Sequence, residues 1–187
     1  QLRPHQEKAI KAMSKHNKGQ VIVPTGGGKT ICMIHDAIEQ FKSDRLKTIV
    51  VVAPRILLAN QLCEEFLEFI DDVDVLHVHS GETHHDSTTN SHKIEEWHWR
   101  SKRNQLIFTT YHSLHKIQKA TAMLADTVYF DEAHNATQKN FVEAVEHHSM
   151  YALRNYFFTA TPKHSFTPFK IGMNDTDIFG GVICNVG

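Results

Sequence analysis

The feature that most constrains the fold is an apolar run, a glycine-rich turn and a helical pattern in immediate succession. The run at residues 21–23 leads into residues 24–30, Pro-Thr-Gly-Gly-Gly-Lys-Thr, and apolar residues then recur at helical spacing from Ile31 to Phe41. A strand, a glycine-rich turn and a helix in this order form the setting that a phosphate-binding loop requires. Glycines let backbone N–H groups turn toward phosphate oxygens where a Cβ would clash, and the helix start adds further N–H groups.

Two side chains complete the predicted phosphate site. Lys29 supplies a positive charge for the outer phosphates of a nucleotide, and the Thr30 hydroxyl can bind Mg²⁺. The usual pattern, G-x-x-x-x-G-K-[ST], has a glycine where this chain has Val23. The alternative is a plain glycine-rich turn with a chance lysine, but the strand before it and the amphipathic helix after it favour the phosphate loop. The residues predicted to bind nucleotide here are Thr25, Gly26, Gly27, Gly28, Lys29 and Thr30.

The totals exclude several classes of protein. The 187 residues, 41% of them hydrophobic, suit one globular domain rather than a disordered chain. The formal net charge of -1 gives no global basic field, so any nucleic acid must be held by local patches. The three cysteines are widely spaced, which fits a reducing compartment, cytoplasmic or nuclear, rather than secretion. No apolar run approaches the roughly 20 residues of a membrane span, so we expect no membrane partner.

Solid apolar runs alternate with helical patterns along the rest of the chain. Residues 48–54 do not alternate in polarity, which is typical of a strand covered on both faces. The alternation predicts an α/β fold, a mostly parallel sheet with helices on both faces. Ligands of such sheets bind beyond the carboxyl ends of the strands, so the polar clusters that follow strands should meet at one edge. These clusters are residues 24–30, 54–55, 109–110, 131–134 and 159–161.

Asp131 and Glu132 form the second half of the predicted nucleotide site. They directly follow the apolar residues 127–130, so the strand should hold both carboxylates at the sheet edge. Asp131 can hold Mg²⁺ through water, and Glu132 can polarise the attacking water. The alternative, two solvated acids in a turn, is disfavoured by the phosphate loop earlier in the chain.

Three of these segments together resemble a known family. Residues 24–30, Asp-Glu-Ala-His at 131–134 and Thr-Ala-Thr at 159–161 are similar to motifs I, II and III of superfamily 2 helicases of the DEAH-box kind. Their order resembles the first of that family's two RecA-like motor domains, and the likeness covers nearly the whole chain. Residues 2–6 and 178–180 are most similar to the branch of type I and type III restriction motors and of repair and phage duplex-remodelling helicases. The resemblance implies a RecA-like three-layer sandwich.

The resemblance also implies roles around the nucleotide. Gln6 is similar to the glutamine that reads the adenine edge, with Arg3 nearby, and an amide suits adenine because it both donates and accepts. The alternative for Gln6 is a surface helix residue. His134 would sense the γ-phosphate, and Thr159 and Thr161 would couple hydrolysis to strand binding.

Further implied roles concern nucleic acid. Pro54 and Arg55 resemble motif Ia, and Thr109 and Thr110 resemble motif Ib or its neighbour. In the family these loops contact the sugar-phosphate backbone, which carries no sequence information. For Arg55 a mere helix-start role is an equal alternative.

The implied function is an ATP-driven motor on nucleic acid, with ATP and Mg²⁺ as cofactors and DNA favoured over RNA. The family's arginine finger comes from the second RecA-like domain, so we expect this chain alone to bind nucleotide but to hydrolyse it slowly. Alternatives are the DNA translocase of a restriction system and a nucleotide-dependent clamp that does not unwind. A small-molecule kinase shares the phosphate loop but lacks the other two motifs.

The ends suggest a piece of a longer protein, since the chain starts at Gln1 rather than Met and stops without a closing helix, and we expect this piece to be monomeric. We predict an N-terminal helix with the adenine-reading motif at residues 1–19 and the ATP-binding domain at 20–168. Residues 169–187 are predicted to be a tail that leads toward a second RecA-like domain.

Two remaining stretches carry alternatives. Trp97 and Trp99 precede three basic residues, and such a mixture can stack unpaired bases; we favour a loop that packs its own tryptophans. Six of the 15 histidines fall between residues 77 and 98. His77 and His79 share a strand face that a metal ion could use, but the sequence pattern favours surface histidines.

Overall fold

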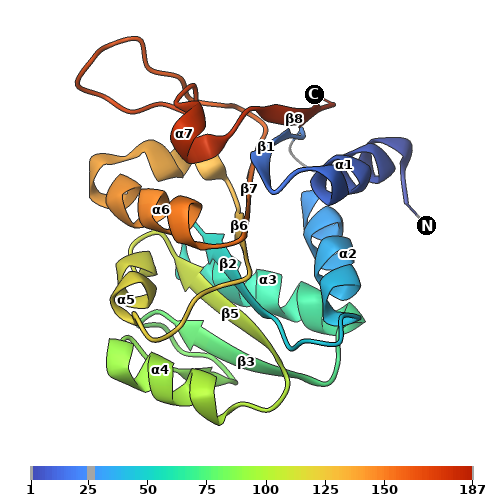
Figure 1. The fold of residues 1–187 in the computed structure, drawn as a ribbon, viewed down its shortest axis with the longest axis vertical. Coiled ribbons are helices and arrows are strands. Elements are labelled where there is room, and N and C mark those ends of the chain that lie inside the picture. Colours follow the sequence, from blue (N-terminus) through green and yellow to red (C-terminus); the bar gives the residue numbers. More distant parts are fainter. Residues whose placement is uncertain (1, 25–27, 187) are drawn as a thin grey trace.

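The computed structural model describes residues 2–24 and 28–186, which form a single sheet with helices on both faces (Figure 1). The described strands are all parallel, in the order β4-β3-β5-β2-β6-β7-β1-β8. The predicted α/β fold is therefore confirmed. The strands are β1 (Lys18–Ile22), β2 (Thr48–Ala53), β3 (Val73–Val78), β4 (Asp86–Ser87), β5 (Asn104–Thr110), β6 (Thr127–Phe130), β7 (Arg154–Thr159) and β8 (Val182–Asn185).

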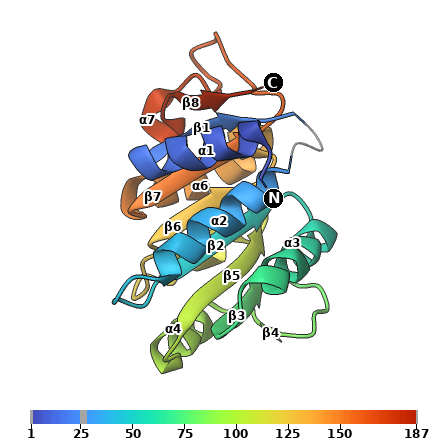
Figure 2. The same ribbon diagram turned by 90° about the vertical axis from the view of Figure 1, so that its right-hand side faces the viewer.

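The helices form two layers. On one face lie α1 (Pro4–Lys15), α2 (Lys29–Phe41) and α3 (Ile56–Phe69), which Figure 2 shows together on the side toward the viewer. The other face is covered by α4 (Ser91–Arg100), α5 (Leu114–Lys119), α6 (Lys139–Tyr151) and α7 (Thr176–Phe179). A short 3₁₀ helix, η1 (Ala133–Thr137), connects β6 to α6.

The two helical layers explain why the sequences of the central strands are unbroken apolar runs. Successive side chains of a strand point to opposite faces of the sheet. In β2, Ile49 and Val51 pack under α1, α2 and α3, whereas Val50 and Val52 pack under the helices of the other face. Each residue of β2 is therefore buried, on one face or the other.

The polar region at residues 80–104 contains β4 and α4. The favoured loop around two tryptophans is wrong: both lie on α4, where Trp97 packs into the core and Trp99 is exposed. The prediction of surface histidines is also wrong for His77 and His79, which are both buried. The ring of His77 stacks on Phe108 of the neighbouring strand, which removes it from solvent.

The C-terminal region also contains elements that we did not predict. α7 and β8 lie within residues 169–187, and β8 pairs with β1 at the edge of the same sheet. A link from this region to a second domain stays a prediction.

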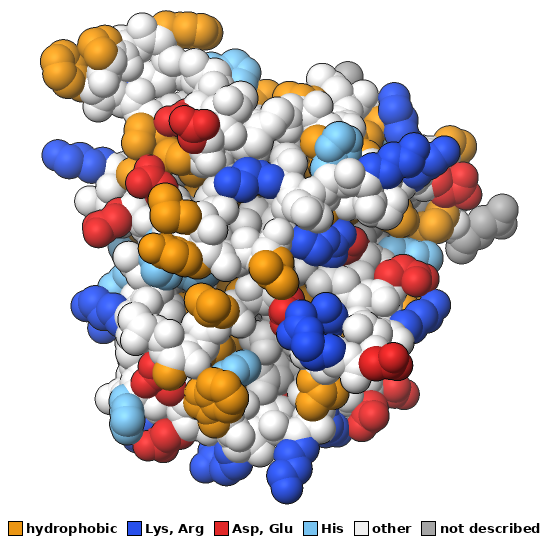
Figure 3. Space-filling model, viewed as in Figure 1, with side chains coloured by type: hydrophobic (Ala, Val, Ile, Leu, Met, Phe, Trp, Pro, Cys, Tyr) orange, Lys and Arg blue, Asp and Glu red, His pale blue; other side chains and the backbone are white. Residues whose placement is uncertain are grey.

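The surface carries mixed charges. Figure 3 shows Lys and Arg side chains interspersed with Asp and Glu on the face it presents, in keeping with the formal net charge of -1. The loop between β7 and α7, which projects at the top left of Figure 1, carries the exposed Phe166 and Phe169. None of the helices in the described part of the chain is long and apolar enough to span a bilayer.

One ion pair ties the first helical layer to the sheet. Arg154, at the start of β7, donates to both carboxylate oxygens of Asp36 on α2, at 2.7 and 2.9 Å. Its guanidinium also donates to the carbonyl of Met13 on α1 at 3.2 Å, and the hydroxyl of Tyr129 on β6 donates to Asp36. Both charges are therefore held by several hydrogen bonds, as a buried pair requires.

We expect Arg154→Ala to lower the free energy of unfolding by about 3–5 kcal/mol, because it leaves the Asp36 carboxylate buried without its cation. Urea unfolding followed by circular dichroism measures the change. The matched control is Lys42→Ala, which removes the ion pair between Lys42 and Glu39. Both of these side chains are 66% exposed, so this substitution should lower the free energy of unfolding by less than about 1 kcal/mol. Equal losses in the two variants would contradict the structural role of Arg154.

Candidate nucleotide-binding site

The turns after β1 and β6 meet at the carboxyl edge of the sheet. Lys29 is the first residue of α2, and Asp131 and Glu132 directly follow β6. Nζ of Lys29 lies 3.1 Å from Oδ1 of Asp131 and also forms an ion pair with Oε1 of Glu132. The structure thus brings together one cation and two carboxylates that are about a hundred residues apart in the chain.

Burial and charge set the electrostatics of this group. Burial raises the pKa of Asp131, and the nearby Lys29 ammonium opposes that shift without cancelling it. Burial alone would lower the pKa of Lys29, but Asp131 and Glu132 outweigh this effect and raise it. Oδ1 of Asp131 is buried and lies 3.1 Å from the Lys29 ammonium, so this oxygen already faces a cation.

Gly28 and Gln6 fit together closely at the end of the glycine-rich turn. Gly28 has φ +77°, and a Cβ there would collide with Nε2 of Gln6 and lie 2.8 Å from Nη2 of Arg3. The Gln6 side chain donates to the Gly28 carbonyl at 3.3 Å and accepts from the backbone N–H of Arg3 at 2.9 Å. Gln6 is only 4% exposed, so the alternative of a surface helix residue is wrong. The predicted nucleotide ligands Thr25, Gly26 and Gly27 lie outside the described residues.

The backbone at Glu132 is left-handed, with φ +48° and ψ +55°. Residues other than glycine are disfavoured in the left-handed region of φ/ψ space. Such conformations concentrate at functional sites, where the surrounding structure stabilises them. The Tyr111 hydroxyl donates to the Asp131 carbonyl at 2.7 Å, and the Asn135 amide donates to the Glu132 carbonyl at 2.9 Å. Sequence reasoning missed Tyr111, because nothing in the pattern after β5 indicates a contact with the acid turn.

A hydrogen-bonded chain connects the acid turn to the end of β7. Nδ1 of His134 lies 2.9 Å from Oγ1 of Thr159, which also accepts from the backbone N–H of Thr161 at 3.1 Å. Since that oxygen already accepts one hydrogen bond, its own proton can point to His134. The three residues are thus joined, although Thr161 takes part only through its backbone.

Glu65 on α3 is a further carboxylate near the site, although its side chain is exposed. The Thr30 side chain lies close enough to favour the charged form of the Glu65 carboxyl group. Partial burial of its carboxyl group raises the pKa of Glu65, and the charges of Glu68 and Asp131 act in the same direction. No signal in the sequence could have found this contact, because helical periodicity gives the face of a residue but not what lies opposite.

The residues predicted to contact nucleic acid differ in their exposure. Arg55 is exposed at the N-cap of α3, and Pro54 beside it is half-buried. Thr109 and Thr110 are buried, and the Thr109 hydroxyl donates to the Val78 carbonyl at 2.7 Å. The predicted contact of these two threonines with a strand stays a prediction.

Comparison with known proteins adds a family and a set of similar structures. A family model described as "Type III restriction enzyme, res subunit" matches residues 1–164. Among curated proteins, none matches the sequence. The fold is similar to that of a nuclease-deletion mutant of the Type ISP restriction-modification enzyme LlaGI in complex with a DNA substrate mimic, with a TM-score of 0.81 at 23% identity. The likeness covers 100% of this chain but only 20% of the LlaGI chain.

Two helicase structures share the fold at lower similarity. The Hef helicase domain of Pyrococcus furiosus has a TM-score of 0.66 at 20% identity, with 96% of this chain and 37% of that chain covered. The UvsW helicase of bacteriophage T4 has a TM-score of 0.63 at 14% identity, with 96% and 58% covered. This chain therefore spans only part of each of these proteins.

We expect Glu132→Gly to be more stable than Glu132→Ala by about 1 kcal/mol, because only glycine adopts the left-handed backbone without a steric penalty. Both variants lose the carboxylate, so the difference in unfolding free energy isolates the backbone term. The matched pair at Glu143, which is exposed on α6, should show the opposite order, with Gly less stable than Ala by about 1 kcal/mol. The same order at both positions would contradict the backbone conformation at Glu132.

Proposed function

This chain belongs to the family of type III restriction enzyme res subunits and has the RecA-like motor-domain fold of superfamily 2 helicases, and we propose that it binds ATP with Mg²⁺. In this proposal, hydrolysis drives movement along a DNA strand. The observation that carries the proposal is the contact of Lys29 with both Asp131 and Glu132. It joins the phosphate loop to the acid pair at one point of the sheet edge, as nucleotide hydrolysis requires.

The residues at this point fit a hydrated magnesium ion. Mg²⁺ prefers oxygen ligands and keeps several of its waters. The Thr30 hydroxyl and the buried Oδ1 of Asp131 offer two oxygens, and Glu65 lies beside Thr30. Bound Mg²⁺ supplies positive charge to the phosphate oxygens, and Lys29 adds a second positive charge from the protein.

Glu132 is the residue that we assign to the attacking water. Its carboxylate is fixed by the left-handed turn and lies beside Lys29, while Asp131 takes the buried position. A carboxylate so placed can accept a hydrogen bond from water and orient it. His134 would then report the phosphate state to Thr159 through their 2.9 Å contact, and the backbone of Thr161 extends that contact toward the DNA-binding surface.

Gln6 and Arg3 are assigned to the base of the nucleotide. Gln6 already closes one side of the phosphate loop through Gly28, which places its amide beside the site. An amide can pair with the donor and acceptor of an adenine edge. DNA would be contacted from the loop at Pro54 and Arg55, and a second RecA-like domain would complete the site.

A second candidate function, DNA translocation within a restriction system, is favoured by the family description. Both candidates use the same ATP site, so they differ in the work done on DNA. A strand-displacement assay on the intact protein separates them, because a helicase releases the displaced strand. A translocase instead dislodges a bound triplex-forming strand without unwinding the duplex.

We expect Lys29→Ala to weaken binding of a nonhydrolysable ATP analogue with Mg²⁺ by about 1.5–3 kcal/mol, or roughly 10–150-fold. The reason is the loss of a charge-assisted contact with the outer phosphates. Isothermal titration calorimetry measures the affinity. Lys42→Ala, at the exposed far end of α2, is the matched control and should bind as the wild type does. Equal affinities for all three proteins would remove Lys29 from the phosphate site.

We expect Glu132→Gln to retain ATP binding and to lower turnover in the intact protein by about 10²–10⁴-fold, because the amide cannot take a proton from the attacking water. DNA-stimulated phosphate release measures the rate, and calorimetry measures the binding. Glu143→Gln, on the exposed face of α6, is the control for a glutamate lost elsewhere. Wild-type turnover in Glu132→Gln would assign the water to another group.

A further inference from the structure

A cavity of about 840 Å³ lies between α3, β3 and the loop that precedes β4. Its lining includes no residue of the nucleotide site. The polar side chains around it include Asn60, Cys63, Glu64, His77, His84 and His85.

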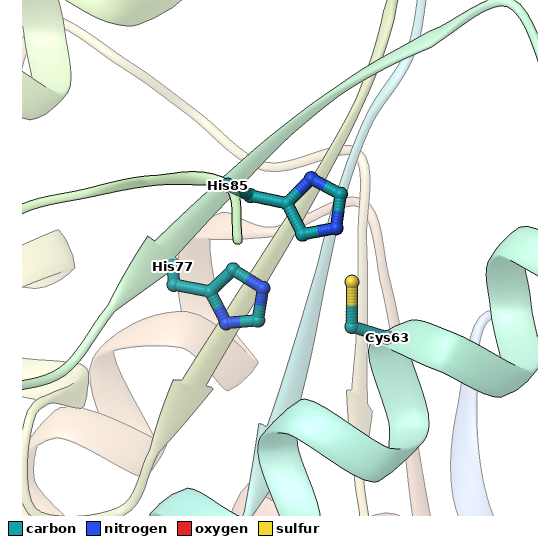
Figure 4. Close-up of side chains that lie close together, drawn as sticks. All are labelled: Cys63, His77 and His85. Carbon is teal, nitrogen blue, oxygen red and sulfur yellow. The ribbon is translucent and has the colours of Figure 1, made fainter. Parts of the chain in front are cut away.

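Three of these side chains converge on one point. Cys63 comes from α3, His77 from β3 and His85 from the loop before β4, and one ligand atom of each lies within 4.8 Å of the other two. Figure 4 shows a ring nitrogen of each histidine turned toward the Cys63 sulfur. The rings of His77 and His85 are stacked, with centroids 5.6 Å apart, so they approach the sulfur side by side.

Two buried polar atoms here lack hydrogen-bond partners among the described residues. His77 is fully buried, and its Nε2 has no partner. Oδ1 of Asn60, which lines the same cavity, is also without one. A buried polar group without a partner is costly, so an unpaired imidazole nitrogen aimed into a cavity beside a thiol indicates a ligand.

We propose that Cys63, His77 and His85 bind a thiophilic divalent cation of the Zn²⁺ class. Thiolate sulfur and imidazole nitrogen are the ligands that Zn²⁺ prefers, at about 2.3 and 2.0–2.1 Å. One sulfur and two nitrogens bound tetrahedrally at those lengths lie roughly 3.3–3.6 Å apart, so the ligand atoms would need to approach one another by at most about 1.5 Å. The fourth position faces the cavity, where Asn60 can accept a hydrogen bond from a bound water.

The neighbours of His77 supply the second layer of contacts that histidine ligands use. The Gly81 N–H donates to Nδ1 of His79 at 3.1 Å, so neutral His79 carries its proton on Nε2, 3.0 Å from Nδ1 of His77. Coordination through Nε2 of His77 moves the His77 proton to Nδ1, where it points to His79. The His79 proton then moves from Nε2 to Nδ1 of the same ring, which breaks the hydrogen bond from the Gly81 N–H. Separately, the Cys63 thiol releases one proton to solvent.

The ion would fasten the loop before β4 to α3 and β3. The strand β4 has only two residues, Asp86 and Ser87, and both are exposed. His85, the outermost of the three ligands, directly precedes it and is itself exposed. A bond from His85 to an ion held by two buried ligands would therefore anchor this edge of the sheet.

The test is a Co²⁺ titration of the tag-free 187-residue chain, with Zn²⁺ as competitor. We expect one equivalent of Co²⁺ to give a thiolate charge-transfer absorption that Zn²⁺ abolishes. Cys63→Ser should lose this absorption, and His85→Ala should weaken affinity at least about tenfold. Cys184→Ser, at another buried free cysteine, and His92→Ala, at an exposed histidine, are the matched controls and should behave as the wild type does.

The exposure of His85 keeps the test informative, since its replacement should leave the fold intact by circular dichroism. In the wild type the amide signal of Gly81 should shift on Zn²⁺ binding, and in His85→Ala that shift should require at least about tenfold more Zn²⁺. The proposal is overturned if the wild type shows no thiolate absorption at saturating Co²⁺. It is also overturned if the absorption survives in Cys63→Ser or the affinity of His85→Ala equals that of the wild type.

Discussion

The contact of Lys29 with Asp131 and Glu132 is the interaction on which the nucleotide site depends. Two carboxylates at a buried sheet edge repel each other and lose solvation, and one ammonium between them offsets part of that cost. The contact exists because β1 and β6 are parallel, so their carboxyl ends reach the same edge although β7 lies between them. An antiparallel arrangement of either strand would place the two motifs at opposite ends of the sheet.

The surrounding residues hold conformations that would be unfavourable alone. Glu132 keeps a left-handed backbone because the Tyr111 hydroxyl and the Asn135 amide bind the carbonyls of the same turn. Gly28 keeps its own left-handed backbone against Gln6, with no room for a Cβ between them. The strain at Glu132 lowers stability where function needs a defined geometry, whereas glycine adopts the left-handed backbone at position 28 without a steric penalty. The site is therefore maintained by its neighbours in the fold as well as by the two motifs: Gln6 comes from α1, Tyr111 follows β5 and Asn135 lies in η1.

The sequence predicted the parts of this architecture that depend on burial alone. Residues 48–54 indicated a central strand because both of its faces must be apolar, and the polar residues after each strand indicated the edge where the candidate site lies. It did not predict α4, whose polar composition hides a helix held by Ile94 and Trp97, nor β8, which needs β1 as its partner. Contacts such as Thr30 with Glu65, or Gln6 with Gly28, depend on how helices pack, which no local pattern specifies.

The two candidate sites use this fold in different ways. At the carboxyl edge, turns from several parallel strands converge, so a large anion can meet N–H groups, a cation and carboxylates together. The cluster of Cys63, His77 and His85 lies instead near the β4 edge of the sheet, between α3, β3 and the loop that joins β3 to β4. Recognition there must come from side chains alone. One thiolate and two imidazoles suffice for a single small ion but not for a nucleotide, so the kind of ligand follows from position in the sheet as well as from residue type.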